Sequence, residues 1–216
     1  MNDLKHKVAQ AVLDYIEPDM VFGVGTGTTV NYLIKELGKI KHKIDACVAS
    51  SKATEALLKA EGIPVIDLNA TYELSLYIDG ADEVTSAGTM IKGGGGAQTR
   101  EKIVATVAKQ FICIVDESKV VTNLGAFPIA VEVLPMARSL VARQIVQLGG
   151  DPEYREAFVT DNGNQILDVY GMELHDPAAL EMQIKTLCGV VENGIFAHRR
   201  ADIILVAAHD GVSRLK

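Results

Sequence analysis

The stretch MVFGVGTGTT at residues 20–29 decides the fold of this chain. Its first half is apolar and has the length of a short buried strand, and its second half is a loop of glycine and threonine. Beyond the loop, apolar residues repeat at the spacing of one helix face, at Val30, Leu33, Ile34 and Leu37. Strand, glycine-rich loop and helix in this order form the first unit of an α/β sheet.

The same alternation continues through the first half of the chain. An amphipathic helix is predicted over residues 4–16, before the first strand. Further elements are predicted as strands at 44–49, 64–68, 74–78 and 111–115, and as helices at 53–60 and 99–109. Strands separated by helices indicate a doubly wound, mostly parallel, Rossmann-like sheet.

The pattern changes at about residue 127. Strands are predicted at 129–133, 157–160, 165–170 and 190–196, and helices at 137–148 and 178–187. The order β-α-β-β-α-β is typical of a ferredoxin-like α+β module, and Asn162-Gly163 favours a hairpin. A last apolar run at 202–207 is predicted to return to the main sheet. We therefore expect a Rossmann-like domain of residues 1–126 plus 198–216, with a ferredoxin-like domain inserted at 127–197.

Charge and composition exclude several classes of partner. The formal net charge is −7, and without a Lys/Arg stripe we expect no nucleic-acid partner. The apolar runs are too short to span a bilayer, and the first residues lack the core of a signal peptide. We expect a cytoplasmic protein with no membrane partner, in which an anionic ligand meets a local positive pocket.

Cysteine and histidine spacing gives no sign of a metal site. Cys47, Cys113 and Cys188 lie far apart, and none of the five histidines falls in a known ligand pattern. We expect three free core thiols and no bound metal.

The chemistry is expected in the loops that follow the strands, because ligands of open α/β sheets bind beyond the carboxyl ends of the strands. Four such loops carry reactive side chains, at residues 23–29, 50–52, 79–83 and 116–119. We expect them all at one edge of the sheet.

The first of these loops has the composition of a phosphate site. It offers backbone N–H groups, hydroxyls and a helix N-terminus, from Gly25, Thr26, Gly27, Thr28 and Thr29. Its G-x-G-x-G spacing differs from the dinucleotide fingerprint, and Ser50-Ser51 stands where a ribose-binding acid is expected. The alternative is a tight strand-to-helix turn that binds nothing.

Two carboxylates and a second glycine loop form the next candidate group. Asp79 and Asp82 flank Gly80, which by itself also fits an Asx turn with solvated acids. The sequence KGGGGAQTREK at 92–102 has four successive glycines, whose entropic cost favours a place where backbone approaches a ligand. Glu101 is then either a general base or an acid that complements the helix dipole.

Lysines could supply the positive charge. Lys92 and Lys119 stand at glycine-loop or predicted strand-end positions, although most lysines are solvated surface residues. Lys5, in the first helix, is a weaker candidate.

With these residues in view, the chain resembles the type A family of ribose-5-phosphate isomerases. The matching motifs are GVGTGTT at 23–29, SSKATE at 50–55, DGADEV at 79–84, KGGGGAQTREK at 92–102, DESK at 116–119, FPIAVEVLPMA at 127–137, VTDNGNQILDV at 159–169 and GVVENGIF at 189–196. They run in order along essentially the whole chain. Gln98 stands where we expect an apolar residue in this family.

The resemblance implies interconversion of D-ribose 5-phosphate and D-ribulose 5-phosphate in the non-oxidative pentose phosphate pathway, without metal or organic cofactor. It makes Glu101 the base that moves a proton between C2 and C1 through an enediolate. It gives Asp79 the opening of the furanose ring and places Asp82 and Lys92 around the sugar oxygens. A homodimer is also implied.

The remaining substrate-binding residues follow from the same resemblance. The phosphate is expected on Thr28, Thr29, Lys119 and Lys5, with the other contacts at Gly25, Thr26, Gly27, Ser50, Gly94 and Gly95. Burial and the neighbouring acids would raise the pKa of Glu101, and Lys92 would lower it. The sequence leaves that balance open.

Two other functions remain open at this stage. One is a sugar-phosphate sensor without catalysis, which would need a DNA-binding segment. The other is an enzyme for a different phosphosugar, such as an amino-sugar phosphate deaminase or a lactonase. Such enzymes often use a site histidine, and none follows the first four strands.

Overall fold

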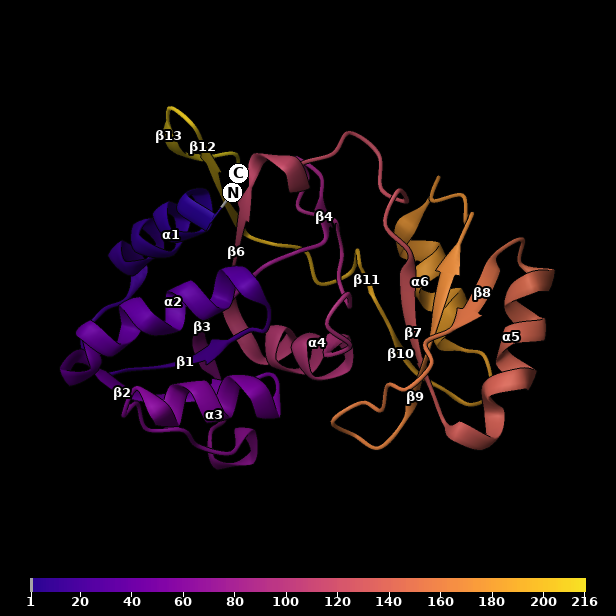
Figure 1. Ribbon diagram of the computed structural model, residues 1–216, viewed down its shortest axis with the longest axis horizontal. Helices are drawn as coiled ribbons and strands as arrows, with labels where there is room; N and C mark the ends of the chain where they lie inside the picture. The colour runs from indigo at the N-terminus through magenta and orange to yellow at the C-terminus, as the bar shows by residue number, and fades with distance from the viewer. Residues whose placement is uncertain (1) are drawn as a thin grey trace.

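A six-stranded sheet forms the centre of the larger lobe in the computed structural model, which describes residues 2–216 (Figure 1). Its strand order is β13-β12-β6-β3-β1-β2, with β12 and β13 antiparallel and every other neighbouring pair parallel. The strands are β1 (Met20–Val24), β2 (Ile44–Ala49), β3 (Leu74–Asp79), β6 (Ala108–Asp116), β12 (Ile203–Ala208) and β13 (Gly211–Arg214). The five parallel strands therefore present their carboxyl ends at one edge.

Both faces of this sheet are covered, which confirms the doubly wound prediction. Side chains of β6 alternate between two apolar clusters: Ile112 and Ile114 belong to one, Phe111 and Cys113 to the other. The first cluster includes residues of α1 (Asn2–Ala11), α2 (Thr28–Lys39) and α3 (Lys52–Ala60), and the second includes residues of α4 (Gln98–Val107). Strands buried on both faces read as continuous apolar runs, as they do here.

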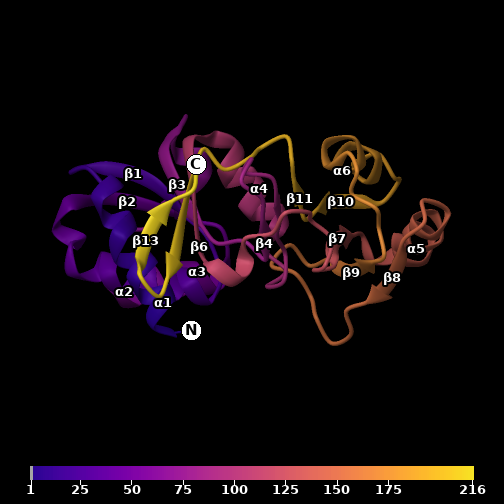
Figure 2. The same ribbon diagram turned by 90° about the horizontal axis from the view of Figure 1, so that it is seen from above.

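The smaller lobe is an antiparallel sheet with two helices. Its strand order is β10-β7-β9-β8, and Figure 2 shows it beside the larger lobe. Along the chain its elements are β7 (Ile129–Val133), α5 (Arg138–Gln147), β8 (Asp151–Tyr154), β9 (Gln165–Tyr170), α6 (Pro177–Lys185) and β10 (Val190–Asn193). This is the β-α-β-β-α-β order of the predicted ferredoxin-like module.

A third, very short sheet was not predicted. It consists of β4 (Glu83–Val84), β5 (Met90–Ile91) and β11 (Ile195–Phe196), in the order β11-β5-β4. The Asp82 amide donates to the Ile91 carbonyl oxygen, and the Lys92 amide donates to that of Gly194, each at 2.9 Å. This sheet therefore fixes Asp82 and Lys92 opposite each other.

Two of the predicted strands were wrong. Residues 64–68 form only one bridge, between Val65 and Cys47. The strand expected at 157–160 lies earlier, as β8, because Ala157 has a φ of 54° that no strand residue adopts. A turn at 160–164 takes its place, in which the Thr160 amide donates to the Asn164 carbonyl oxygen.

Three further predictions need correction. The run at 190–196 is split into β10 and β11 at Gly194, where a Cβ would lie 2.1 Å from the Lys92 carbonyl oxygen. The first α-helix ends at Ala11 and continues as a 3₁₀ turn over Val12–Tyr15. Cys188 is exposed, whereas the other two cysteines are buried. Among residues 2–216, no helix has the length and apolarity to cross a membrane.

Candidate active site

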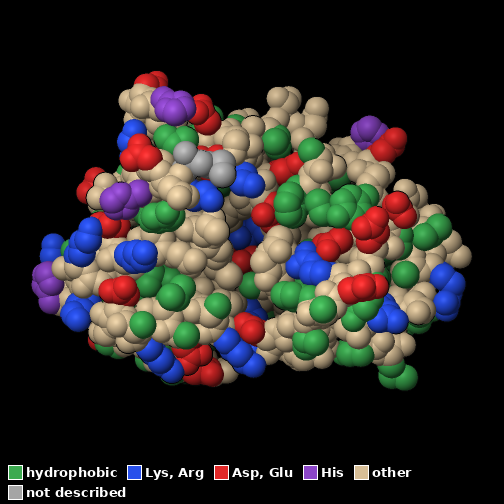
Figure 3. Space-filling model, in the orientation of Figure 1, with side chains coloured by type: hydrophobic (Ala, Val, Ile, Leu, Met, Phe, Trp, Pro, Cys, Tyr) green, Lys and Arg blue, Asp and Glu red, His purple; other side chains and the backbone are tan. Residues whose placement is uncertain are grey.

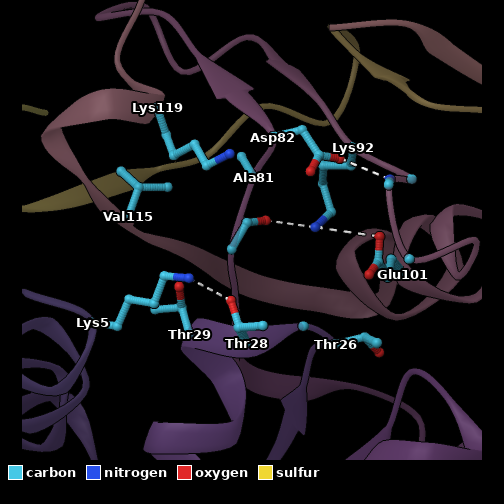
Figure 4. Close-up of a pocket in the computed structure, with 15 residues that line it drawn as sticks. Lys5, Thr26, Thr28, Thr29, Ala81, Asp82, Lys92, Glu101, Val115 and Lys119 are labelled. Atoms are coloured by element: carbon cyan, nitrogen blue, oxygen red, sulfur yellow. Dashed lines mark hydrogen bonds and ion pairs between the residues drawn. The ribbon is translucent and has the colours of Figure 1, made fainter. Parts of the chain in front are cut away.

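A cavity opens at the carboxyl edge of the main sheet, close to where the two lobes meet (Figure 4). In Figure 3 a hollow separates the lobes, and basic and acidic side chains are visible in it. Most of the predicted site residues line the cavity: Lys5, Thr26, Gly27, Thr28, Thr29, Asp82, Lys92, Gly94, Gly95, Glu101 and Lys119. The residues that the strand-end argument singled out therefore gather at one cavity.

Some residues differ between the predicted and the observed lining. Within residues 2–216 the lining does not include Gly25, Ser50 or Asp79, which were predicted. It does include Gly80, Ala81, Gly93 and Val115, which were not. Gly80, Ala81 and Gly93 are apolar or glycine neighbours of predicted residues, and Val115 lies near the end of β6, so only a position next to a strand end or glycine loop could have pointed to them.

One end of the cavity is formed by hydroxyls, amines and the start of α2. The Lys5 ammonium donates to Thr28 Oγ1 at 2.7 Å. Gly27, with a φ of +116°, leads into the helix, whose first N–H groups have no partners within the helix. In Figure 4 Lys5 and Lys119 extend from opposite walls into the same space. Two amines, a helix N-terminus and hydroxyls together suit a phosphate.

Buried charges form the other end. The Lys92 ammonium lies 2.7 Å from Asp79 Oδ2, 2.6 Å from the Gly80 carbonyl oxygen and 3.3 Å from Glu101 Oε2. The Lys92 and Glu101 side chains are 3% and 6% exposed, so solvent screens these charges weakly. Burial opposes the charge on Lys92, but Asp79 and Glu101 outweigh it and raise the lysine pKa above its ordinary value.

Glu101 is held as a weak acid. Burial raises its pKa and repulsion from Asp79 raises it further, while Lys92 lowers it, and the result is a pKa of about 8. The balance that the sequence left open thus favours a carboxyl group that titrates near neutrality. Such a group can both accept and return a proton at physiological pH.

Asp82 lies beside this cluster on the cavity wall. Its Oδ2 accepts a hydrogen bond from the Gly94 amide at 2.8 Å. Because Gly94 and Gly95 also line the cavity, the second glycine loop and Asp82 form one wall.

Asp79 lies behind the cavity, and each of its two carboxylate oxygens has two partners within the protein. Its Oδ1 accepts from the Thr26 amide at 3.0 Å and the Gly80 amide at 2.7 Å. Its Oδ2 accepts from Lys92 and from the Tyr77 hydroxyl, the latter at 2.5 Å. A Cβ at Gly25 would lie 2.0 Å from this carboxylate, so Gly25 makes room for Asp79.

Two supporting residues have clear partners. Ser50 is buried, and its hydroxyl lies 2.9 Å from Thr26 Oγ1, so it fixes a cavity residue from behind. Tyr77, fully buried and missed by the sequence analysis, holds Asp79. A hydroxyl two residues before Asp79 in a strand shares its face, and that spacing was the available signal.

The described residues 2–216 contain no group of three or more His, Cys, Asp or Glu placed to hold a metal ion.

The family model of ribose 5-phosphate isomerase A (phosphoriboisomerase A) matches residues 46–211. The chain belongs to the ribose-5-phosphate isomerase A family. Ribose-5-phosphate isomerase A of Legionella pneumophila (strain Corby) is 70% identical over 216 residues, which is 100% of both chains.

Solved structures of the ribose-5-phosphate isomerase A family share the whole fold. The Neisseria gonorrhoeae protein is 45% identical with a TM-score of 0.97, covering 99% of this chain and 96% of that one. The Methanocaldococcus jannaschii protein is 40% identical with a TM-score of 0.94, covering 99% and 98%. A D-ribose-5-phosphate isomerase in complex with phospho-erythronic acid is 37% identical with a TM-score of 0.95, covering 99% and 98%.

Proposed function

We propose that this protein interconverts D-ribose 5-phosphate and D-ribulose 5-phosphate, in the non-oxidative pentose phosphate pathway, with Glu101 as the base. The observation that carries the proposal is the position of Glu101: a buried carboxyl group with a pKa of about 8, on the cavity wall, 3.3 Å from a lysine ammonium. Isomerisation of an aldose needs such a base next to a fixed positive charge.

The proton transfer follows from these positions. Ionised Glu101 takes the proton from C2 while the C1 carbonyl becomes the oxygen of an enediolate. Glu101 then returns the proton to C1 as the hydroxyl proton moves from O2 to O1, and the ketose results. Lys92, held between Asp79 and Glu101, stabilises the negative charge that develops on the oxygens.

Ring opening precedes this step, and the resemblance gives it to Asp79. All four contacts of Asp79 are internal, and it does not line the cavity. We therefore assign the ring-opening proton transfer to Asp82, which does line the cavity. Asp79 acts behind it by holding Lys92 and the Thr26 amide.

The phosphate binds at the other end of the cavity, on Lys5, Lys119, Thr28 and Thr29. A relative 37% identical to this chain is known in complex with phospho-erythronic acid. The planar carboxylate of that acid resembles the planar enediolate. Its phosphate would lie at the lysine end and its carboxylate at the Glu101 end.

The test is incubation with ribose 5-phosphate in the presence of a metal chelator, with ketose formation as the readout. We expect full activity with the chelator. Binding without turnover would support the sensor alternative, and turnover of an amino-sugar phosphate alone would support a deaminase.

We further propose a homodimer in the cytoplasm, as the family resemblance implies. Light scattering on the purified protein would distinguish the mass of one chain from that of two. Fractionation of cells that make the protein would test its location.

A further inference from the structure

Arg155, in the smaller lobe, reaches across to the second glycine loop. It directly follows β8, and its Nε and Nη2 donate to the two oxygens of Asp168 on β9 at 2.8 and 2.5 Å. On its other side, Nη1 and Nη2 each lie 3.2 Å from the Gly93 carbonyl oxygen, and Nη1 lies 3.4 Å from that of Gly94. One guanidinium thus connects the antiparallel sheet to two carbonyl groups of the loop.

These contacts determine which way the loop amides point. In a trans peptide the C=O of one residue and the N–H of the next point in opposite directions. The Gly93 carbonyl accepts from Arg155 and also from the Gly96 amide at 2.9 Å. The Gly94 N–H therefore faces away from Arg155 and donates to Asp82 Oδ2 at 2.8 Å. The Gly94 carbonyl is held in the same way, so the Gly95 N–H also faces away from Arg155.

We propose that Arg155 is a positioning residue that sets the Gly93–Gly94 and Gly94–Gly95 peptide planes for the reaction. With these planes set, the Gly94 amide orients Asp82, and the Gly95 amide is available to a sugar oxygen in the cavity that Gly95 lines. This inference rests on the proposed isomerase function for its catalytic meaning, and its structural part is measurable without it.

The composition of the loop explains the need for such an anchor. Four successive glycines have more accessible backbone states than any other tetrapeptide, and Gly93 and Gly96 adopt positive φ values of 110° and 74°. Left alone, the loop would spend much of its time in states in which the Gly94 amide does not reach Asp82 Oδ2. A fixed geometry at a catalytic wall raises the rate by avoiding this reorganisation.

Arg199 provides a matched control. Its guanidinium also holds backbone carbonyls, those of Ala105 at 2.8 Å, Ala108 at 3.1 Å and Arg200 at 2.8 Å, and pairs with Asp202 at 3.0 Å. The two arginine side chains are similarly exposed, 18% for Arg155 and 22% for Arg199. None of the partners of Arg199 lines the cavity.

The experiment compares Arg155→Ala, Arg155→Lys and Arg199→Ala. We expect Arg155→Ala to lose about tenfold to a hundredfold in kcat/KM for ribose 5-phosphate, as misplacement near the reacting atoms does. Arg155→Lys should also lose activity, because an ammonium cannot reproduce the forked contacts. Arg199→Ala should keep the wild-type kcat/KM, and millimolar guanidinium should restore part of the activity of Arg155→Ala.

Amide hydrogen exchange gives a second readout that needs no activity. The amides of Gly94 and Gly96 are hydrogen-bonded, so we expect them to exchange faster in both Arg155 variants and at the wild-type rate in Arg199→Ala. Equal losses of kcat/KM and Tm in Arg155→Ala and Arg199→Ala, or unchanged exchange in the Arg155 variants, would overturn the inference. If the wild type failed to isomerise ribose 5-phosphate while exchange still separated the variants, the proposed function would fail and the loop assignment would stand.

Discussion

The two ends of the cavity are built in different ways. At the end proposed for the phosphate, the polar groups are flexible side chains on helices and turns, such as Lys5, whose contact with Thr28 is exposed. At the proton-transfer end Lys92 and Glu101 are almost completely buried, and Asp79 behind them accepts four hydrogen bonds or ion pairs. The first arrangement suits the binding of an anion from water, and the second raises the pKa of Glu101.

This difference predicts which kinetic parameter each end controls. A contact to a remote phosphate is present in both the ground state and the transition state, so its loss weakens binding. A buried base beside a cation matters when charge develops, so its loss lowers kcat. Variants at the two ends should therefore separate KM from kcat.

The largest effect is expected at Glu101. Glu101→Gln removes the base but keeps the shape of the side chain, so turnover should fall at least about a hundredfold while ribose 5-phosphate still binds. Steady-state kinetics and calorimetric titration would measure the two quantities. The control is Glu55→Gln, at a half-exposed carboxylate paired with Lys59 on α3. A near-normal kcat in Glu101→Gln would remove this residue from its role.

The effect of pH on kcat/KM should be almost as large as the effect of Glu101→Gln. Because Glu101 must be ionised and its pKa is about 8, kcat/KM should fall about tenfold per pH unit as the pH drops well below 8. The substrate phosphate titrates near pH 6, so a decline that begins above pH 7 belongs to the enzyme. Lys119→Ala should show the same profile, since it leaves the other end intact. A flat profile between pH 6 and 8 would contradict the assigned pKa.

A smaller effect, on KM and not on kcat, is expected at Lys119. Lys119→Ala should raise KM about tenfold with kcat little changed, because one cation is lost from the phosphate site. The remaining activity should also depend less on salt, since fewer charges attract the anion. Lys59→Ala, on α3, is the control. Unchanged KM and kcat/KM would show that Lys119 does not hold the phosphate.

The smallest effect is expected at Tyr77, whose hydroxyl donates to Asp79, the partner of Lys92. Tyr77→Phe removes one hydrogen bond to Asp79, worth about 1 kcal/mol. If the whole of this free energy stabilises the transition state, kcat falls roughly fivefold. KM should stay near its wild-type value, because the phosphate end is untouched. A variant in which KM rises and kcat does not would show that the two ends are coupled.

The sequence was sufficient for the fold wherever periodicity was regular. The parallel strands were predicted because they are apolar runs next to helical patterns. The order of the antiparallel lobe was also predicted, although β8 (Asp151–Tyr154) is not an apolar run and was placed at 157–160. Residues 157–160 were misassigned because Asn162-Gly163 indicates a tight hairpin, whereas the segment that connects β8 to β9 is longer than a hairpin turn. The domain boundaries at residues 127 and 197 stay a prediction, which limited proteolysis can test.

The site was predictable to the extent that its residues follow strands. Asp82 and Lys119 were predicted in this way, and Lys92 and Glu101 from the glycine loop that they flank; the structure places all four on one cavity. Whether a residue lines the cavity or supports it from behind, as Asp79 does, depends on side-chain packing that spacing does not encode. Gln98 illustrates the same limit, since it is fully buried and neither polar atom of its side chain has a hydrogen-bond partner within residues 2–216.

The short sheet of β4, β5 and β11 has a consequence for how the protein is made. Lys92 is held by a hydrogen bond to Gly194, so its final position depends on a residue that the ribosome adds about a hundred positions later. Pairing between such distant segments costs loop-closure entropy and slows folding. We expect a nascent or truncated chain that stops before β11 to be inactive, although it contains every residue that we propose for the reaction. Recovery of enzyme activity would therefore report the end of folding.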